Sequence, residues 1–324
     1  MSGVSLALVL AALQGGQSLD RSALVHYVSK PDRSYAWQDS AKGGRHALRL
    51  TSQTWQGTVW RHDLVRIDPP VASKEGAAII EVTGWEPNQA DYRLAQSMAE
   101  ASGLPVYVLF QVPAQPLWGR EEDALIAYSV EKFLSGDGED WPLLLPMVKS
   151  VKAAMDAIQE STKGLIDRFV VTGASKRGWT TWLSAATGDA RLLGIAPRVY
   201  DNLGIQRQLD RQLDYWGTYS PMIRDYTDRG LQHVLGSQEG KRLIQMVDPM
   251  EYLPHLSVPT LVVTATNDPY WTVDSMQVYW PDMAMPKLAL SVPNANHGLG
   301  ETSAWAPTVG WCPVSHTILS GGME

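Results

Sequence analysis

The sequence is poor in residues that form disulfides and metal sites. Cys312 is its one cysteine in 324 residues, so no internal disulfide is possible, and no Cys-x-x-Cys pair indicates zinc or redox chemistry. Seven histidines are scattered along the chain, and none stand four residues apart as in a helical metal site. We therefore expect no metal ion and no other cofactor.

An excess of basic charge and a long apolar run are also absent. Lys and Arg number 27 against 34 Asp and Glu, which gives a net charge of −7 and no indication of nucleic-acid or anionic-membrane binding. The apolar run at residues 4–13 is too short to span a bilayer, so no membrane insertion is expected. It resembles the apolar part of a secretory signal, although no Lys or Arg precedes Arg21.

These features predict two parts of the chain. Residues 1–18 are expected to be a signal-like or disordered segment, and residues 19–324 a single domain. The signal-like run favours a periplasmic or secreted protein, with the cytoplasm as the alternative. Nothing in the sequence indicates an oligomeric state.

Strand and helix patterns alternate along most of the chain. Residues 35–68 read as antiparallel strands with a tight turn at Gln56 and Gly57. Apolar, β-branched runs predict buried strands at 76–84, 104–112, 168–172, 192–197, 260–266 and 287–293. Helical patterns separate them at 89–103, 121–134, 141–160, 176–187 and 274–280. The alternation predicts an α/β fold: a mostly parallel sheet with helices on both faces. Residues 201–246 do not continue the alternation of strands and helices, and their pattern predicts a helical insert or lid.

Three chemically important residues follow predicted strands. Ser175 lies in "VVTGASKRGWTTWL", Asp268 follows "TLVVTATN", and His297 follows "LALSVPNAN". The carboxyl ends of parallel strands meet at one edge of a sheet, where ligands bind. A serine hydroxyl becomes a nucleophile when an imidazole takes its proton and a carboxylate orients the ring. The order Ser, acid, His is that of α/β-hydrolases, so we predict this fold and this catalytic triad.

Two alternatives stay open at this stage. Ser175 could instead cap the following helix, because the usual G-x-S-x-G motif is altered: Arg177 takes the place of the second glycine, which follows as Gly178. Asp274 is the other candidate for the acid. Its position before a predicted helix suits an N-cap, whereas Asp268 directly follows a predicted strand.

Acyl transfer also needs donors for the oxyanion and a binding pocket. The backbone amide of Lys176 is the first donor candidate, and Gly84 and Trp85 in the loop after an early strand are the second. The side chains of Lys176 and Arg177 either attract a substrate carboxylate or pair with acidic residues. Thirteen tryptophans stand against three phenylalanines. Three of them are candidates for substrate binding: Trp179, Trp216 and Trp271.

Several segments together resemble the PhoPQ-activated pathogenicity-related protein family. These are "GASKRGWTTWL", "WPLLLPMVKSVKAAMDAIQE", "VDPMEYL" and "NDPYWTVDSMQVYW" leading into "PNANHGL", and the resemblance runs from about Leu19 to Leu299. It implies an α/β-hydrolase fold and export. It also implies that Ser175 is the nucleophile, Asp268 the acid and His297 the base. The serine turn further resembles that of glucuronoyl esterases, with Lys176 as the basic residue after the nucleophile.

The predicted function is that of a serine hydrolase, a carboxylesterase that cleaves small esters through an acyl-enzyme. A peptidase or amidase of the same fold is the alternative within this class. A non-catalytic, secreted binding or signalling protein is the alternative outside it.

Overall fold

The computed structural model describes residues 22–71 and 76–299. The predicted N-terminal segment 1–18 and Cys312 lie outside the described residues. The strands form one sheet in the order β1-β2-β3-β5-β4-β6-β7-β8-β9. Their bounds are Ala36–Lys42 (β1), Arg45–Trp55 (β2), Thr58–Ile67 (β3), Ala77–Val82 (β4), Val106–Leu109 (β5), Arg168–Ala174 (β6), Leu192–Arg198 (β7), Thr260–Ala265 (β8) and Lys287–Val292 (β9).

Strand directions divide the sheet into two parts. Strands β1, β2 and β3 pair antiparallel, and β3 also runs antiparallel to β5. From β5 through β4, β6, β7 and β8 to β9, all neighbours are parallel. The predicted mostly parallel sheet with antiparallel N-terminal strands is therefore confirmed. The carboxyl ends of β6, β8 and β9 lie at one edge, since these strands point the same way.

Helices cover both faces of the sheet because side chains alternate along buried strands. In β4, Ile79 packs with α2 (Gln89–Ser102) in one core, and Ile80 packs with α4 (Leu144–Ser161) in the other. Gly103 ends α2 in the left-handed conformation, at φ 71°. Helices α1 (Ser22–Ser29), α3 (Glu122–Leu134) and α5 (Lys176–Ala186) also contribute to the second core.

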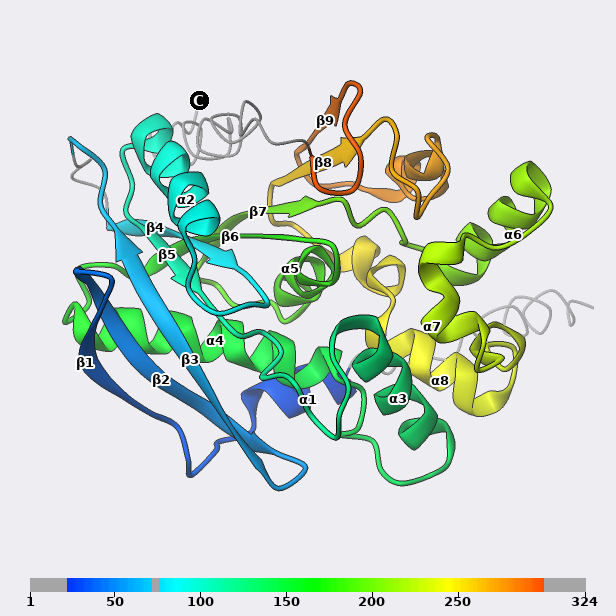
Figure 1. The fold of residues 1–324 in the computed structure, drawn as a ribbon, viewed down its shortest axis with the longest axis horizontal. Helices are drawn as coiled ribbons and strands as arrows, with labels where there is room; N and C mark the ends of the chain where they lie inside the picture. Colours follow the sequence, from blue (N-terminus) through cyan, green and yellow to red (C-terminus); the bar gives the residue numbers. More distant parts are fainter. Residues whose placement is uncertain (1–21, 72–75, 300–324) are drawn as a thin grey trace, which may run out of the picture.

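The predicted helical insert follows β7 and is confirmed. It contains α6 (Ile205–Trp216), α7 (Arg224–Thr227) and α8 (Gln238–Val247), together with the short 3₁₀ turns η1 (Pro221–Ile223) and η2 (Leu231–His233). Figure 1 shows the insert at the end of the molecule away from β1, β2 and β3, with α7 and α8 near α3. The turn η3 (Pro249–His255) leads from the insert into β8.

The prediction of a helix at 274–280 is wrong. The structure has two 3₁₀ turns there, η4 (Ser275–Val278) and η5 (Trp280–Asp282). Pro281 lacks an N–H and disfavours the α conformation of the residue before it, which prevents a continuous helix. Asp274 precedes η4, but its side chain makes no capping hydrogen bond.

Candidate active site

Ser175 occupies a sharp turn between β6 and α5. Its backbone has φ 57° and ψ −127°, a conformation that non-glycine residues rarely adopt. The Ser175 side chain makes no helix-capping hydrogen bond, so the N-cap interpretation is wrong. Its N–H donates to the Arg198 carbonyl at 2.9 Å, which ties the turn to the end of β7. This strained strand-to-helix turn is the geometry of a nucleophile elbow.

Close packing around the turn explains its altered glycine pattern. A Cβ on Gly178 would lie 2.8 Å from the Arg198 carbonyl oxygen, so Gly178 provides the close approach usually given by the glycine one position earlier. Arg177 can stand in that earlier position because neighbouring glycines leave room for it. A Cβ on Gly173 would lie 2.8 Å from the Arg177 Cβ, and one on Gly84 would overlap the guanidinium.

The three predicted catalytic side chains are joined by hydrogen bonds. His297 Nε2 lies 2.8 Å from Ser175 Oγ, and His297 Nδ1 lies 2.8 Å from Asp268 Oδ2. The other oxygen of Asp268 accepts the Tyr270 N–H at 2.9 Å, which fixes the carboxylate. The Tyr270 ring stacks on the imidazole with centroids 4.1 Å apart. The chain Asp268–His297–Ser175 thus has the connectivity needed to activate a hydroxyl.

Asp274, the rival acid, faces another partner. Its carboxylate pairs with the Arg211 guanidinium and accepts a hydrogen bond from the Tyr215 hydroxyl at 3.0 Å. Both partners belong to α6. Asp274 therefore joins the insert to the segment after β8, and His297 is bonded to Asp268 instead.

The oxyanion candidates lie beside the triad in a cleft of about 370 Å³ whose wall is partly polar and partly apolar. Gly84, Trp85, Ser175, Lys176 and His297 all line it. Helix α5 begins at Lys176, so its first N–H groups have no acceptor within the helix and are available to an anion. Trp85 is 52% exposed at the cleft, and its carbonyl is held by the Gln111 N–H at 3.2 Å.

The side chains of Lys176 and Arg177 are buried and paired inside the protein. Both contact the Glu122 carboxylate, with Lys176 Nζ at 2.8 Å and Arg177 Nη1 at 2.7 Å. Lys176 Nζ also lies 3.2 Å from Asp123. Burial favours the neutral form of Glu122, but Arg177 and Lys176 outweigh it and lower the pKa of this carboxyl to about 2. These two cations therefore organise the site and are not free for a substrate carboxylate.

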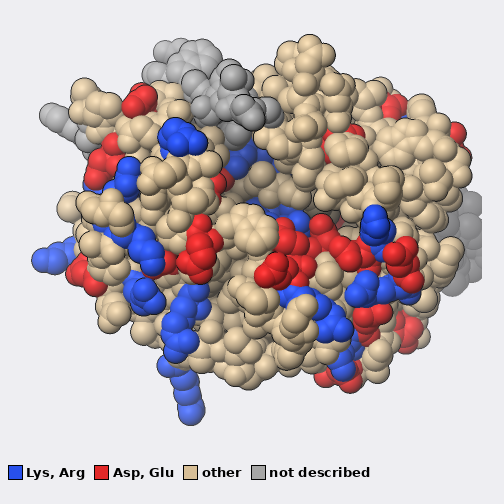
Figure 2. Space-filling model, viewed as in Figure 1, with Lys and Arg blue, Asp and Glu red and all other residues tan. Residues whose placement is uncertain are grey.

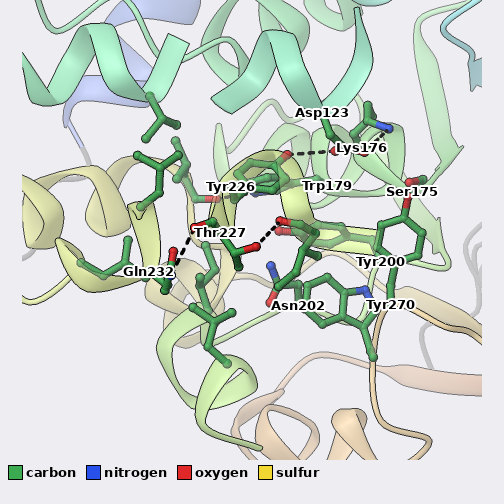
Figure 3. A pocket seen from close by; sticks show the side chains of 18 of the residues that line it. Asp123, Ser175, Lys176, Trp179, Tyr200, Asn202, Tyr226, Thr227, Gln232 and Tyr270 are labelled. Atoms are coloured by element: carbon green, nitrogen blue, oxygen red, sulfur yellow. Dashed lines mark hydrogen bonds and ion pairs between the residues drawn. The ribbon is translucent and has the colours of Figure 1, made fainter. Parts of the chain in front are cut away.

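A second, mostly apolar cavity of about 110 Å³ opens from Ser175 into the insert (Figure 3). Trp179 and Trp271 both line it and are each 7% exposed. Trp179 also donates its indole N–H to the Val247 carbonyl, which fixes its position under the serine turn. Trp216 is 42% exposed at the end of α6 and lines neither hollow around Ser175. The prediction that Trp216 contacts substrate thus has no support in the geometry.

Sequence reasoning missed several residues that build the site. Glu122 and Tyr270 lie in segments whose patterns gave no chemical signal. The buried Glu81–Arg198 pair, with oxygen–nitrogen distances of 2.6 Å, was also missed. A charged residue inside each of two apolar strands was the available signal, because such charges are rarely buried unless paired.

The described residues show neither a metal-type cluster nor a helix able to span a membrane. In residues 22–71 and 76–299, no group of three His, Cys, Asp or Glu side chains could hold a metal ion. No helix in these ranges is long and apolar enough to cross a bilayer. Acidic and basic side chains are intermixed over the face shown in Figure 2.

The fold is that of the α/β-hydrolases. Acetyl xylan esterase 1 from Thermoanaerobacterium sp. JW/SL YS485 has a similar structure, with a TM-score of 0.60 at 14% identity over 86% of this chain and 88% of that one. An esterase from Pyrococcus furiosus gives a TM-score of 0.52 at 12% identity over 88% and 92% of the two chains. At such low identity the likeness concerns the fold alone.

Sequence comparison identifies the protein family of the chain. Residues 24–310 match the PhoPQ-activated pathogenicity-related protein family, and the chain belongs to this family. The autocrine proliferation repressor protein A of Dictyostelium discoideum is 33% identical over 91% of this chain. The chain spans 65% of the length of that relative.

Proposed function

We propose that this protein is a serine carboxylesterase. The observation that carries the proposal is the continuous hydrogen-bonded chain from Asp268 through His297 to Ser175, with 2.8 Å at both contacts. Esterases of similar fold support the proposal in a general way. The two hollows that meet at Ser175 leave room for the two parts of an ester.

In the proposed reaction, His297 Nε2 takes the proton of Ser175 as Oγ attacks the ester carbonyl. Asp268 holds the Nδ1–H tautomer and stabilises the imidazolium that forms. The amides of Lys176 and of the Gly84–Trp85 turn stabilise the negative oxygen of the tetrahedral intermediate. His297 then protonates the leaving alcohol, and water releases the acid from the acyl-Ser175 ester by the same steps.

The test combines turnover with covalent labelling. We expect hydrolysis of p-nitrophenyl acetate and butyrate, and fluorophosphonate labelling confined to Ser175. In Ser175→Ala both signals should disappear while the unfolding temperature stays near that of the wild type. An unlabelled, inactive wild type would contradict the proposal.

A second candidate is a signalling role, with or without catalysis. The observation that favours it is the name of the 33% identical relative, a repressor of proliferation. An export route, periplasmic or secreted, is part of this candidate. A proliferation assay with purified wild type and Ser175→Ala separates the two: equal repression by both proteins means that any signalling does not need the esterase.

A further inference from the structure

The apolar cavity contains a group of polar atoms without partners. Asn202 Oδ1 and Gln232 Oε1 are buried and accept no hydrogen bond from the described residues, and the buried Tyr200 Oη has only the adjacent Asn202 side chain as a polar neighbour, outside normal hydrogen-bond geometry. All three side chains line the cavity. Figure 3 shows Tyr200 and Asn202 between Ser175 at one end and Gln232 at the other. Buried polar atoms are almost always hydrogen-bonded in native proteins, to protein, water or ligand, so three in one cavity mark places where a polar group of a ligand can bond in place of water.

Other polar groups of the same cavity are already paired. The Tyr226 hydroxyl donates to Asp123 at 2.9 Å, and the same carboxylate lies 3.2 Å from Lys176 Nζ. The charges at the wall are therefore compensated, which favours a neutral ligand. The remaining wall is apolar, with side chains such as Leu209, Leu243 and Val247.

The unpartnered atoms define the chemistry of the missing group. The amide oxygens of Asn202 and Gln232 accept hydrogen bonds, whereas the Tyr200 hydroxyl both donates and accepts. Burial and the Asp248 charge raise the pKa of the Tyr200 phenol well above its ordinary value, and hydrogen bonding from the Asn202 side chain opposes this only in part. Tyr200 therefore stays protonated. A ligand hydroxyl can donate to Asn202 and accept from Tyr200 together, since these two side chains are neighbours.

We propose that this cavity receives an ester chain carrying a neutral hydroxyl group, which Tyr200 and Asn202 bind while the ester carbon lies at Ser175. This inference rests on the proposed esterase function and adds a substrate class to it. The chain belongs to either the acid or the alcohol half of the ester, and both present the same chemistry to the cavity.

The first test compares matched esters. One pair is p-nitrophenyl 6-hydroxyhexanoate and p-nitrophenyl heptanoate. The other pair is 6-hydroxyhexyl acetate and heptyl acetate, whose hydrolysis is measured by the release of acid. A purely apolar cavity would prefer the alkyl ester of each pair, because the hydroxyl loses its water on entry. We expect kcat/KM to favour the hydroxylated ester by about tenfold or more in one pair. That pair identifies the half of the ester that enters the cavity. Alkyl preference in both pairs would overturn the inference.

The second test removes the binding groups. Tyr200→Phe deletes one oxygen, and Asn202→Leu replaces an amide by an apolar group of similar size. In the ester pair that shows the preference, each variant should reduce the ratio of kcat/KM for the hydroxylated ester to kcat/KM for the alkyl ester by about fivefold or more. Tyr35→Phe is the matched control, because the Tyr35 hydroxyl is also buried but lies outside the cavity. An unchanged ratio in Tyr200→Phe, which keeps the side-chain shape, would refute the assignment.

The third test separates this inference from the esterase proposal. Thermal unfolding of Ser175→Ala is measured with 6-hydroxyhexanamide and with heptanamide, which need no turnover. Greater stabilisation by the hydroxylated amide supports the cavity assignment even in a protein without esterase activity. Turnover of p-nitrophenyl acetate by the wild type, combined with equal effects of both amides, would retain the esterase and refute the hydroxyl site.

Discussion

The two hollows that meet at Ser175 differ in their walls and in their origin. The cleft of mixed polarity is built by the ends of β4, β6 and β7 and the start of α5, and the buried Glu81–Arg198 pair lines it. The cavity is built mainly by the insert and is mostly apolar. The parallel sheet thus positions the proposed catalytic residues, whereas the insert forms the wall that a substrate chain would contact.

This difference separates two kinds of effect. Changes in the sheet-derived part should alter the reaction for every ester, because they affect groups bonded to Ser175 or His297. Changes in the insert should alter the ratio between esters, because they affect only the bound chain.

The largest effect is expected for Asp268→Asn. An asparagine would leave the geometry intact but would favour the wrong tautomer of His297, so kcat should fall by about 10⁴ for short and long esters alike. Steady-state kinetics with p-nitrophenyl acetate and octanoate measures this loss.

Asp274→Asn is the matched control for that change. Its partners are Arg211 and Tyr215 on α6, so kcat should stay within a few fold of the wild type. A large loss in Asp274→Asn, with near-normal turnover in Asp268→Asn, would transfer the acid role to Asp274.

The arrangement of Ser175, Asp268 and His297 was predictable from the sequence because each follows a strand with a clear apolar signal. Parallel strand ends must meet at one edge of the sheet, so local patterns were enough to bring distant residues together. The choice of Asp268 over Asp274 followed the same reasoning, since Asp268 lies nearer the end of its strand. Its bond to His297 agrees with that choice.

The surroundings of the triad were not predictable in this way. Lys176 and Arg177 are paired with Glu122 from α3, and only the folded chain brings these segments together. Gly84 was expected to let an amide approach the substrate, and the structure adds a second reason for glycine there, because a Cβ would overlap the Arg177 guanidinium. Trp216 lines neither hollow around Ser175, and a sequence pattern alone does not tell which side chains of an insert face a cavity.

Glu122→Gln should give the second largest effect. It leaves Arg177 and Lys176 buried with less compensation, so the free energy of unfolding should fall by roughly 3–5 kcal/mol in urea denaturation at pH 7. Glu121→Gln alters an exposed neighbour and should change stability by less than about 0.5 kcal/mol. A loss below about 1 kcal/mol in Glu122→Gln would mean that the cluster is not structurally important.

Asp201 lines a small hollow together with Asp268, and its titration should make the free energy of unfolding depend on pH. Burial raises its pKa to about 7, with a hydrogen bond from Tyr279 opposing and the Asp268 charge adding to the rise. Between about pH 4 and 7 the folded state then holds a proton that the unfolded chain has released. Stability should therefore fall as the pH rises, by up to about 1.4 kcal/mol per pH unit.

Asp201→Asn should remove this slope. The comparison is sharpest between pH 6 and 7, because burial also raises the pKa of Asp248, to about 6, and that group accounts for part of the slope at lower pH. Urea denaturation at several pH values measures the change, with the exposed Asp228→Asn as control. Parallel pH profiles for the wild type and Asp201→Asn would contradict the prediction.

The smallest effect tests the insert directly. Leu209 lines the cavity, so Leu209→Trp should reduce the space for a chain and lower the kcat/KM ratio of p-nitrophenyl octanoate to acetate by about tenfold. Leu213, one turn further along α6, is 40% exposed and lies outside the cavity, so Leu213→Trp should leave the ratio unchanged. Equal losses for both esters in Leu209→Trp would mean that the insert also positions the reacting groups, and the division between sheet and insert would fail.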